Sequence, residues 1–153
     1  MTVTIRKADP AEPQATALLQ ASHALMRLLF PPEDNYFLEI EELRVPSITF
    51  LVAEGPDGVV LGTGALARKD GYAEVKSMFV APEARGQGVA AKVLHALEQL
   101  ARDEDVAVMR LETGTLLDAA HRLYERHGFV ARGPFGDYTE SASSLFFEKS
   151  LRG

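Results

Sequence analysis

The stretch Arg85-Gly86-Gln87-Gly88-Val89-Ala90 decides the fold expected for this chain, because of the segments on either side of it. Residues 74–80 before it read Glu-Val-Lys-Ser-Met-Phe-Val, a strand-like run that Ala81-Pro82 closes. Residues 90–100 after it carry apolar side chains at helical spacing. Glycines let a backbone pass close to a ligand, and a helix start offers unpaired N–H groups and a positive dipole end. The order of strand, glycine loop and helix therefore predicts an anion site, most naturally for a pyrophosphate.

Two common nucleotide-binding loops fit this stretch poorly. A P-loop requires Gly-Lys-Ser/Thr, whereas Gly88 is followed by Val89-Ala90. The Rossmann pattern G-x-G-x-x-G/A is met by Gly86, Gly88 and Ala91, but five residues, 81–85, separate the strand from the first glycine. A dinucleotide enzyme that binds NAD through these glycines stays open as an alternative.

A third pattern, R/Q-x-x-G-x-G/A, is met by Arg85, Gly88 and Ala90 after a strand and a turn containing Pro82. It resembles motif A of the GNAT superfamily, the acyl-CoA-dependent N-acetyltransferases. A second segment, residues 120–129, is similar to the A-x-x-L-Y-x-x-x-G-F signature of the same family. The later Gly133-Pro134-Phe135-Gly136-Asp137-Tyr138 looks like a branch of small bacterial GNAT proteins, most of them without a known substrate.

Periodicity and turn residues predict the elements of the chain. Strands are expected at 2–7, 48–54, 59–66, 73–80, 106–112, 129–132 and 144–151, and helices at 15–29, 36–43, 89–103 and 119–126. This order is that of the GNAT fold. The resemblance implies an α/β fold with a mixed, mostly antiparallel central sheet, flanked by helices and splayed between the fourth and fifth strands.

Composition bounds the function. The chain has 153 residues, so we expect a single domain over 1–153, and 46% apolar with 25% charged residues is typical of a soluble globular protein. A net charge of −6 argues against nucleic-acid binding and suits a cationic substrate. The absence of cysteine excludes disulfides and thiolate metal sites and suits the cytoplasm. The alternating N-terminus predicts a strand and no signal peptide. No apolar run reaches the ~20 residues of a membrane span. The four histidines lack the spacing of metal ligands.

The resemblance implies acetyl-CoA as co-substrate and assigns residues to it. The pantetheine arm is expected to lie along the strand end by strand addition, with the pyrophosphate on the loop N–H groups and a charge-assisted contact from Arg85. The expected cofactor-binding residues are Met78, Phe79, Val80, Arg85, Gly86, Gln87, Gly88, Val89 and Ala90. The alternative for the strand end is a plain core strand without a ligand, and the alternative for Arg85 is a solvated surface arginine. Many relatives carry Asn seven residues before the signature tyrosine, where this chain has Leu117, so that contact is absent or replaced.

Two catalytic residues are expected. Tyr124 is the signature tyrosine and the candidate acid, since a phenol can protonate a leaving thiolate. Glu74 is the candidate base, in a place similar to that of a glutamate in the histone-modifying branch. Lys76 lies two residues on, and a nearby cation makes a carboxylate a weaker base. A strand bulge is expected to separate the two side chains; a surface Glu–Lys pair, or a water chain to Glu74, are the alternatives.

The acceptor pocket is expected at the loop after the first helix and at the C-terminal hairpin. Acidic and aromatic side chains there could recognise a cationic amine. The candidates are Glu33, Asp34, Tyr36, Phe135, Asp137 and Tyr138.

The predicted function is transfer of an acetyl group from acetyl-CoA to a primary amine of a small molecule or amino acid, by direct attack in a ternary complex and without metal. Two alternatives stay open: a non-catalytic acyl-CoA sensor, and a protein lysine or N-terminus as acceptor. No membrane partner is expected, and a homodimer is suggested only by analogy with relatives.

Overall fold

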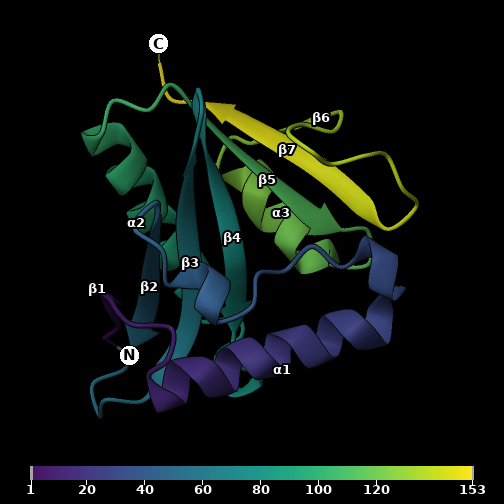
Figure 1. Ribbon diagram of the computed structural model, residues 1–153. Coiled ribbons are helices and arrows are strands. Elements are labelled where there is room, and N and C mark those ends of the chain that lie inside the picture. The colour runs from purple at the N-terminus through teal and green to yellow at the C-terminus, as the bar shows by residue number, and fades with distance from the viewer. Residues whose placement is uncertain (1, 153) are drawn as a thin grey trace.

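The computed structural model describes residues 2–152 and is built on one seven-stranded sheet with the order β1-β2-β3-β4-β5-β7-β6 (Figure 1). The strands are β1 (Thr4–Lys7), β2 (Ile48–Glu54), β3 (Val60–Lys69), β4 (Tyr72–Val80), β5 (Val108–Gly114), β6 (Val130–Arg132) and β7 (Ser144–Ser150). The helices are α1 (Pro13–Leu29), α2 (Val89–Asp103) and α3 (Asp118–Arg126), with short 3-10 turns η1 (Pro32–Asp34), η2 (Glu41–Leu43) and η3 (Pro82–Ala84). The two end residues of the domain expected over 1–153 lie outside the described part.

The sheet is split at its centre. Neighbouring strands run antiparallel except β4 and β5, which are parallel and pair only at Ala73–Met109 and Glu74–Arg110. Beyond these pairs the two strands diverge (Figure 1). The expected α/β fold with a splay between the fourth and fifth strands is confirmed.

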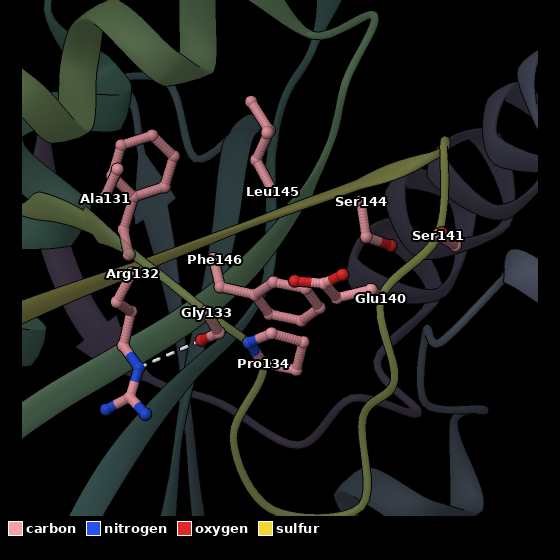
Figure 2. A pocket seen from close by; sticks show the side chains of 10 residues that line it. Ala131, Arg132, Gly133, Pro134, Glu140, Ser141, Ser144, Leu145 and Phe146 are labelled. Carbon is pink, nitrogen blue, oxygen red and sulfur yellow. Dashed lines mark hydrogen bonds between the residues drawn. The ribbon is translucent and has the colours of Figure 1, made fainter.

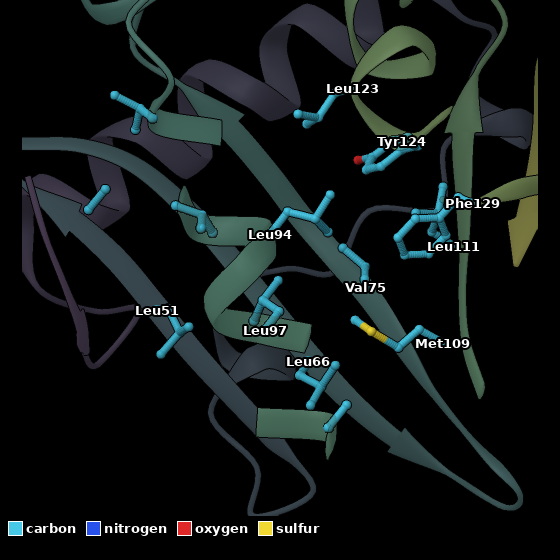
Figure 3. Close-up of a cluster of buried hydrophobic side chains, with 14 of the residues drawn as sticks. Leu51, Leu66, Val75, Leu94, Leu97, Met109, Leu111, Leu123, Tyr124 and Phe129 are labelled. Carbon is cyan, nitrogen blue, oxygen red and sulfur yellow. The ribbon is translucent and has the colours of Figure 1, made fainter. Parts of the chain in front are cut away.

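Helices cover both faces of the sheet. Because side chains alternate along a strand, Leu51 and Ala53 of β2 face one way and Phe50 and Val52 the other. The first pair belongs to the larger core, which β3, β4 and β5 share with α2 and α3 (Figure 3). The second pair packs with Ala15 and Leu19 of α1 in a smaller core on the opposite face. No helix within residues 2–152 is long and apolar enough to span a membrane.

The helix expected at 36–43 is wrong. Only Glu41–Leu43 forms a 3-10 turn, and residues 35–40 run without regular structure. Tertiary packing overrides the local pattern: the Phe37 ring stacks on His23 at 4.1 Å, and the Tyr36 ring meets Tyr138 edge-on at 5.0 Å. These contacts draw the segment across the sheet toward the C-terminal hairpin.

Close packing of α2 on β3 depends on a missing side chain at Gly64. A Cβ there would lie 2.5 Å from Val93 Cγ1 and 2.9 Å from Met78 Sδ. Gly64→Ala is therefore expected to lower the free energy of unfolding by about 1–3 kcal/mol, as other overpacked cores do. Urea unfolding measures the change. The matched control is Gly133→Ala, where an added Cβ meets nothing within 4 Å; equal losses in both variants would contradict the packing explanation.

Candidate active site

The split between β4 and β5 opens a cavity of about 740 Å³. Its walls come from the second half of β4, the glycine loop, the end of β5, α3 and the segment that follows α1. Three stretches that are far apart in the sequence, within residues 22–37, 75–91 and 112–126, thus meet at one hollow together with Ser143. A cavity of this size is ordinary for a small-molecule site.

The β4 wall contains a bulge. Thr63 of β3 lies opposite Phe79 and Ala65 lies opposite Lys76, so β4 carries one extra residue between those pairs. Ser77 in the bulge has φ 57°, a left-handed conformation that is uncommon outside glycine. Its Oγ is the single side-chain polar atom in residues 2–152 that is fully buried without a hydrogen-bond partner. Strain and an unsatisfied group of this kind concentrate at functional sites.

Beyond the bulge, β4 presents an open strand edge to the cavity. Met78, Phe79 and Val80 line it, and none of the three pairs with β5. A strand edge without a partner leaves backbone N–H and C=O groups available to a ligand. This wall can therefore hold an extended ligand by strand addition.

The glycine loop forms the outer end of the cavity. Gly86 and Gly88 line it with φ of 77° and 79°, and Gly88 is the N-cap of α2. The Arg85 guanidinium donates to the Val80 carbonyl at 3.3 Å and lies 5.6 Å from the centre of the Phe79 ring. Loop N–H groups at a helix start, with an arginine beside them, can bind an anion.

Most of the expected cofactor residues lie on this cavity, and two do not. Val89 is 1% exposed in the core, and Gln87 turns away to donate to the Glu83 carbonyl at 3.3 Å. The residues of the expected set that line the cavity are Met78, Phe79, Val80, Arg85, Gly86, Gly88 and Ala90.

Tyr124 reaches the cavity from α3. Its ring is 5% exposed and packs against Phe129 and Phe147, with centroids 5.8 and 6.2 Å away. Tyr124 is part of the cavity lining, and its hydroxyl, which is not fully buried, makes no hydrogen bond to residues 2–152. Burial, helped by the charge of Glu112, raises the pKa of Tyr124 above its usual value. The phenol therefore keeps its proton at neutral and mildly basic pH and can act as a donor.

Glu74 lies in a buried hydrogen-bonded cluster. The Tyr138 hydroxyl donates to Glu74 Oε2 at 2.5 Å, and Lys76 Nζ lies 3.5 Å from the same oxygen. Lys76 Nζ also donates to the Tyr138 hydroxyl at 2.8 Å and to the Tyr36 carbonyl at 3.1 Å. Glu74 is 4% exposed, so the surface Glu–Lys pair is wrong. The bulge follows both residues, at Ser77, and does not separate them.

The expected acceptor residues divide into three pairs: one lines the cavity, one is exposed outside it, and the buried or half-buried pair in the C-terminal loop is absent from its lining. Asp34 and Tyr36 line the cavity, and Asp34 Oδ2 accepts a 2.7 Å hydrogen bond from the Ser143 hydroxyl. Glu33 and Asp137 are exposed outside the cavity lining.

Phe135 and Tyr138 hold the C-terminal loop in place. Phe135 is 5% exposed and meets Tyr72, Tyr138 and Phe146 edge-on. Residues of the same hairpin line a smaller hollow of about 430 Å³, where Phe146 approaches Pro134 (Figure 2). The loop is therefore anchored by its own aromatic packing and by the Glu74 cluster.

Four charged residues that line the cavity were missed by the sequence reasoning: Glu112, Asp118, Arg122 and Arg126. Glu112 of β5 lines the cavity, and the Ser144 hydroxyl donates to its Oε2 at 2.8 Å. Burial raises the pKa of Glu112 above its usual value. Arg122 and Arg126, one helical turn apart on α3, line the same cavity. The signal for Glu112 was a carboxylate within a segment interpreted as a buried strand.

Comparison with known proteins agrees with the geometry. Residues 15–129 match the family model described as "Acetyltransferase (GNAT) family". The IAA acetyltransferase of Azospirillum brasilense is 39% identical over 97% of this chain and 98% of its own. The uncharacterized N-acetyltransferase YedL of Escherichia coli is 37% identical over 97% of this chain and 94% of its own.

Solved structures share the whole fold. One from Klebsiella pneumoniae, described as that of an acyl-CoA N-acyltransferase, superposes with a TM-score of 0.83 at 33% identity and 99% coverage of both chains. Two further structures, at 20% and 24% identity, contain coenzyme A and acetyl-CoA, respectively. The fold and cavity define an acyl-transferring enzyme. The chain belongs to the GNAT family of acetyltransferases and is an N-acetyltransferase by class.

The Tyr138 hydroxyl is the link between the C-terminal loop and β4. Tyr138→Phe leaves Glu74 and Lys76 short of a partner, so we expect a loss of about 1–3 kcal/mol in the free energy of unfolding. Burial and the charge of Glu74 raise the pKa of Tyr138, so the hydroxyl stays protonated below the unfolded-state value. The loss should therefore be the same at about pH 7 and about pH 9, both below the free tyrosine pKa of about 10.

Urea unfolding at the two pH values measures this loss. Tyr36→Phe is the matched control, because the Tyr36 hydroxyl has no hydrogen-bond partner among residues 2–152 and only its backbone carbonyl meets Lys76. A Tyr138→Phe protein as stable as the Tyr36→Phe protein would contradict the proposed link.

Proposed function

We propose that the enzyme transfers an acetyl group from acetyl-CoA to a primary amine on a small molecule or amino acid, by direct attack in a ternary complex. One observation carries the proposal: the open edge of β4 continues into the glycine loop within a single cavity. An extended arm that contains amides and ends in a pyrophosphate matches this arrangement, with the amides on the strand edge and the pyrophosphate on the loop. The proposed use of acetyl-CoA is supported by the structures of the same fold that contain it or coenzyme A.

The residues present fit such a donor. An added Cβ at Gly86 or Gly88 would meet nothing within 4 Å, so the loop leaves open space above its N–H groups. Arg122 and Arg126 add positive charge on the facing helix. The donor supplies an activated acetyl thioester; the protein positions it and moves protons.

Tyr124 is the proposed acid. Its hydroxyl meets the cavity with its proton retained, which suits protonation of a leaving thiolate. Two carboxylates are candidates for the base, Glu74 from the sequence and Glu112 from the structure. The other expectations from the sequence, a cytoplasmic location and a homodimer, stay predictions.

The acceptor side favours a cationic amine. Asp34 and Glu112 line the cavity there, with Tyr36 as an aromatic wall. These groups match an ammonium by charge and by cation–π contact. A protein lysine or N-terminus presents the same chemistry and is included in the test.

Calorimetric titration with acetyl-CoA, CoA and NAD tests the donor, and thiol release from acetyl-CoA tests the reaction. The acceptor panel contains glycine, lysine, spermidine, tyramine and a lysine-containing peptide. We expect binding of acetyl-CoA over NAD and release that depends on a small amine. Binding of acetyl-CoA without thiol release from any amine supports the sensor alternative. Thiol release with the peptide alone identifies a protein acceptor. Preferential binding of NAD contradicts the proposal.

Tyr124→Phe removes the proposed proton donor while keeping the ring that packs against Phe129 and Phe147. We expect kcat to fall by about 100-fold or more with acetyl-CoA affinity unchanged, as for loss of a general acid. Thiol release and calorimetry measure the two quantities. Unchanged turnover would remove Tyr124 from the mechanism.

A further inference from the structure

Glu112 lies at the apex of the split between the two central strands. The last pair between β4 and β5 joins Glu74 to Arg110. Glu112 is two residues past Arg110, so its side chain points to the same face of the sheet. It is the first residue on that face of β5 beyond the last pair with β4. A ligand that lies between the diverging strands would end beside this side chain.

One oxygen of Glu112 is available to a ligand. Its Oε2 accepts the Ser144 hydroxyl at 2.8 Å, and no described residue donates to its Oε1. Ser77 Oγ is the single polar side-chain atom in residues 2–152 that is both fully buried and unpartnered, so Glu112 Oε1 is not fully buried, and Glu112 lines the cavity. By contrast, Glu74 is absent from the cavity lining and is held by Tyr138 and Lys76.

Glu112 and Tyr124 act on the cavity from opposite faces of the sheet. Leu111 packs with Tyr124 in the core below α3, where Figure 3 shows the Tyr124 hydroxyl on the side of its ring toward β4. Glu112 is the next residue along β5 and therefore points to the other face, beside Ser144. A group that passes through the split meets a proton donor on one side and a carboxylate on the other.

We propose that Glu112, and not Glu74, accepts the proton of the acceptor ammonium, while Glu74 positions the C-terminal loop through Tyr138. This inference rests on the acetyl transfer proposed above.

The proton balance closes with these two residues. The Glu112 carboxylate takes one proton from R–NH₃⁺, which frees the nitrogen lone pair to form the C–N bond to the acetyl carbonyl. When the C–S bond breaks, Tyr124 gives its proton to the thiolate. The extra proton on the new amide nitrogen returns through water to Tyr124. Glu112 releases its proton to solvent, so the sum is one acetamide, one CoA thiol and one proton.

The charged and titratable groups around Glu112 come from several elements. Lys76 and Glu74 face it from β4, and Asp34 from η1. Tyr124 approaches from α3, where the charge of Glu112 affects it. Lys76 favours the ionised carboxylate, whereas Glu74, Asp34 and burial oppose it. Burial is the largest effect, so Glu112 should change charge at a higher pH than a free glutamate.

Glu112→Gln is the decisive variant, because glutamine keeps the shape and can still accept from Ser144. With the panel amine that turns over fastest, we expect kcat/KM at about pH 7 to fall by about 100-fold or more. The gap between wild type and variant should narrow as the pH rises toward the pKa of the acceptor amine, about 10.4 for a lysine side chain, because more of the amine is then already unprotonated. In the wild type, kcat/KM should fall on the acid side of the pH profile as Glu112 becomes protonated. This acid limb should be absent from the variant.

The comparisons are Glu74→Gln and Glu125→Gln. Glu74→Gln should keep the acid limb while raising the acceptor KM, since it loosens the Tyr138 loop. Glu125 is exposed on α3 and serves as the matched control with an unchanged profile. Activity of Glu112→Gln within about threefold of wild type, or loss of the acid limb in Glu74→Gln instead, would overturn the assignment.

A titration that needs no acceptor completes the test. The carboxyl ¹³C resonance missing from Glu112→Gln identifies Glu112 in the wild type, and its midpoint should lie above the free glutamate value of about 4.3. A midpoint at or below that value overturns the proposal. Failure of the wild type to release thiol with every amine is a different result, because it removes the proposed function itself.

Discussion

The whole site depends on the early end of pairing between β4 and β5. Two residue pairs join these strands, and both then continue without each other. If β4 and β5 paired along their full length, β5 would take up the backbone N–H and C=O groups that β4 leaves unpaired along the cavity. Loss of that pairing costs stability, and the remaining strands offset it: β5 pairs with β7 over its full length, and β4 pairs with β3 on its other edge. The fold thus keeps a rigid frame around one unpaired edge.

The bulge at Ser77 adjusts this open edge. One extra residue in β4 changes the phase of the side chains, so Lys76 pairs opposite Ala65 while Phe79 pairs opposite Thr63. Thr63 Oγ1 donates to the Ser77 carbonyl at 2.8 Å and fixes the bulge from the neighbouring strand. The polar part of β4 before the bulge and the apolar part after it can therefore serve different parts of one cavity, which are the acceptor side and the donor side in the proposed function.

Much of this architecture was predictable from sequence. The glycines at 86 and 88 and the apolar periodicity of α2 are local signals, and β2 and α2 were predicted with the bounds that the structure has. The proposed role of Glu112 was not predictable, because it depends on where β5 parts from β4, a property of strand register. The helix prediction for residues 35–40 was wrong for a similar reason, because the conformation of this segment depends on contacts with His23 and Tyr138, which are distant in the chain.

Lys76 joins two loops to β4 beside the cavity. Its ammonium meets the Tyr36 carbonyl, the Tyr138 hydroxyl and Glu74, which come from three separate segments. Burying a lone cation would be costly, so each partner is needed for the others to stay in place. The loop after α1 and the C-terminal loop have little regular structure of their own, and this shared cation joins both to β4. Glu74, the base expected from the sequence, thus has the contacts of a structural clamp, whereas Glu112, across the split, lines the cavity.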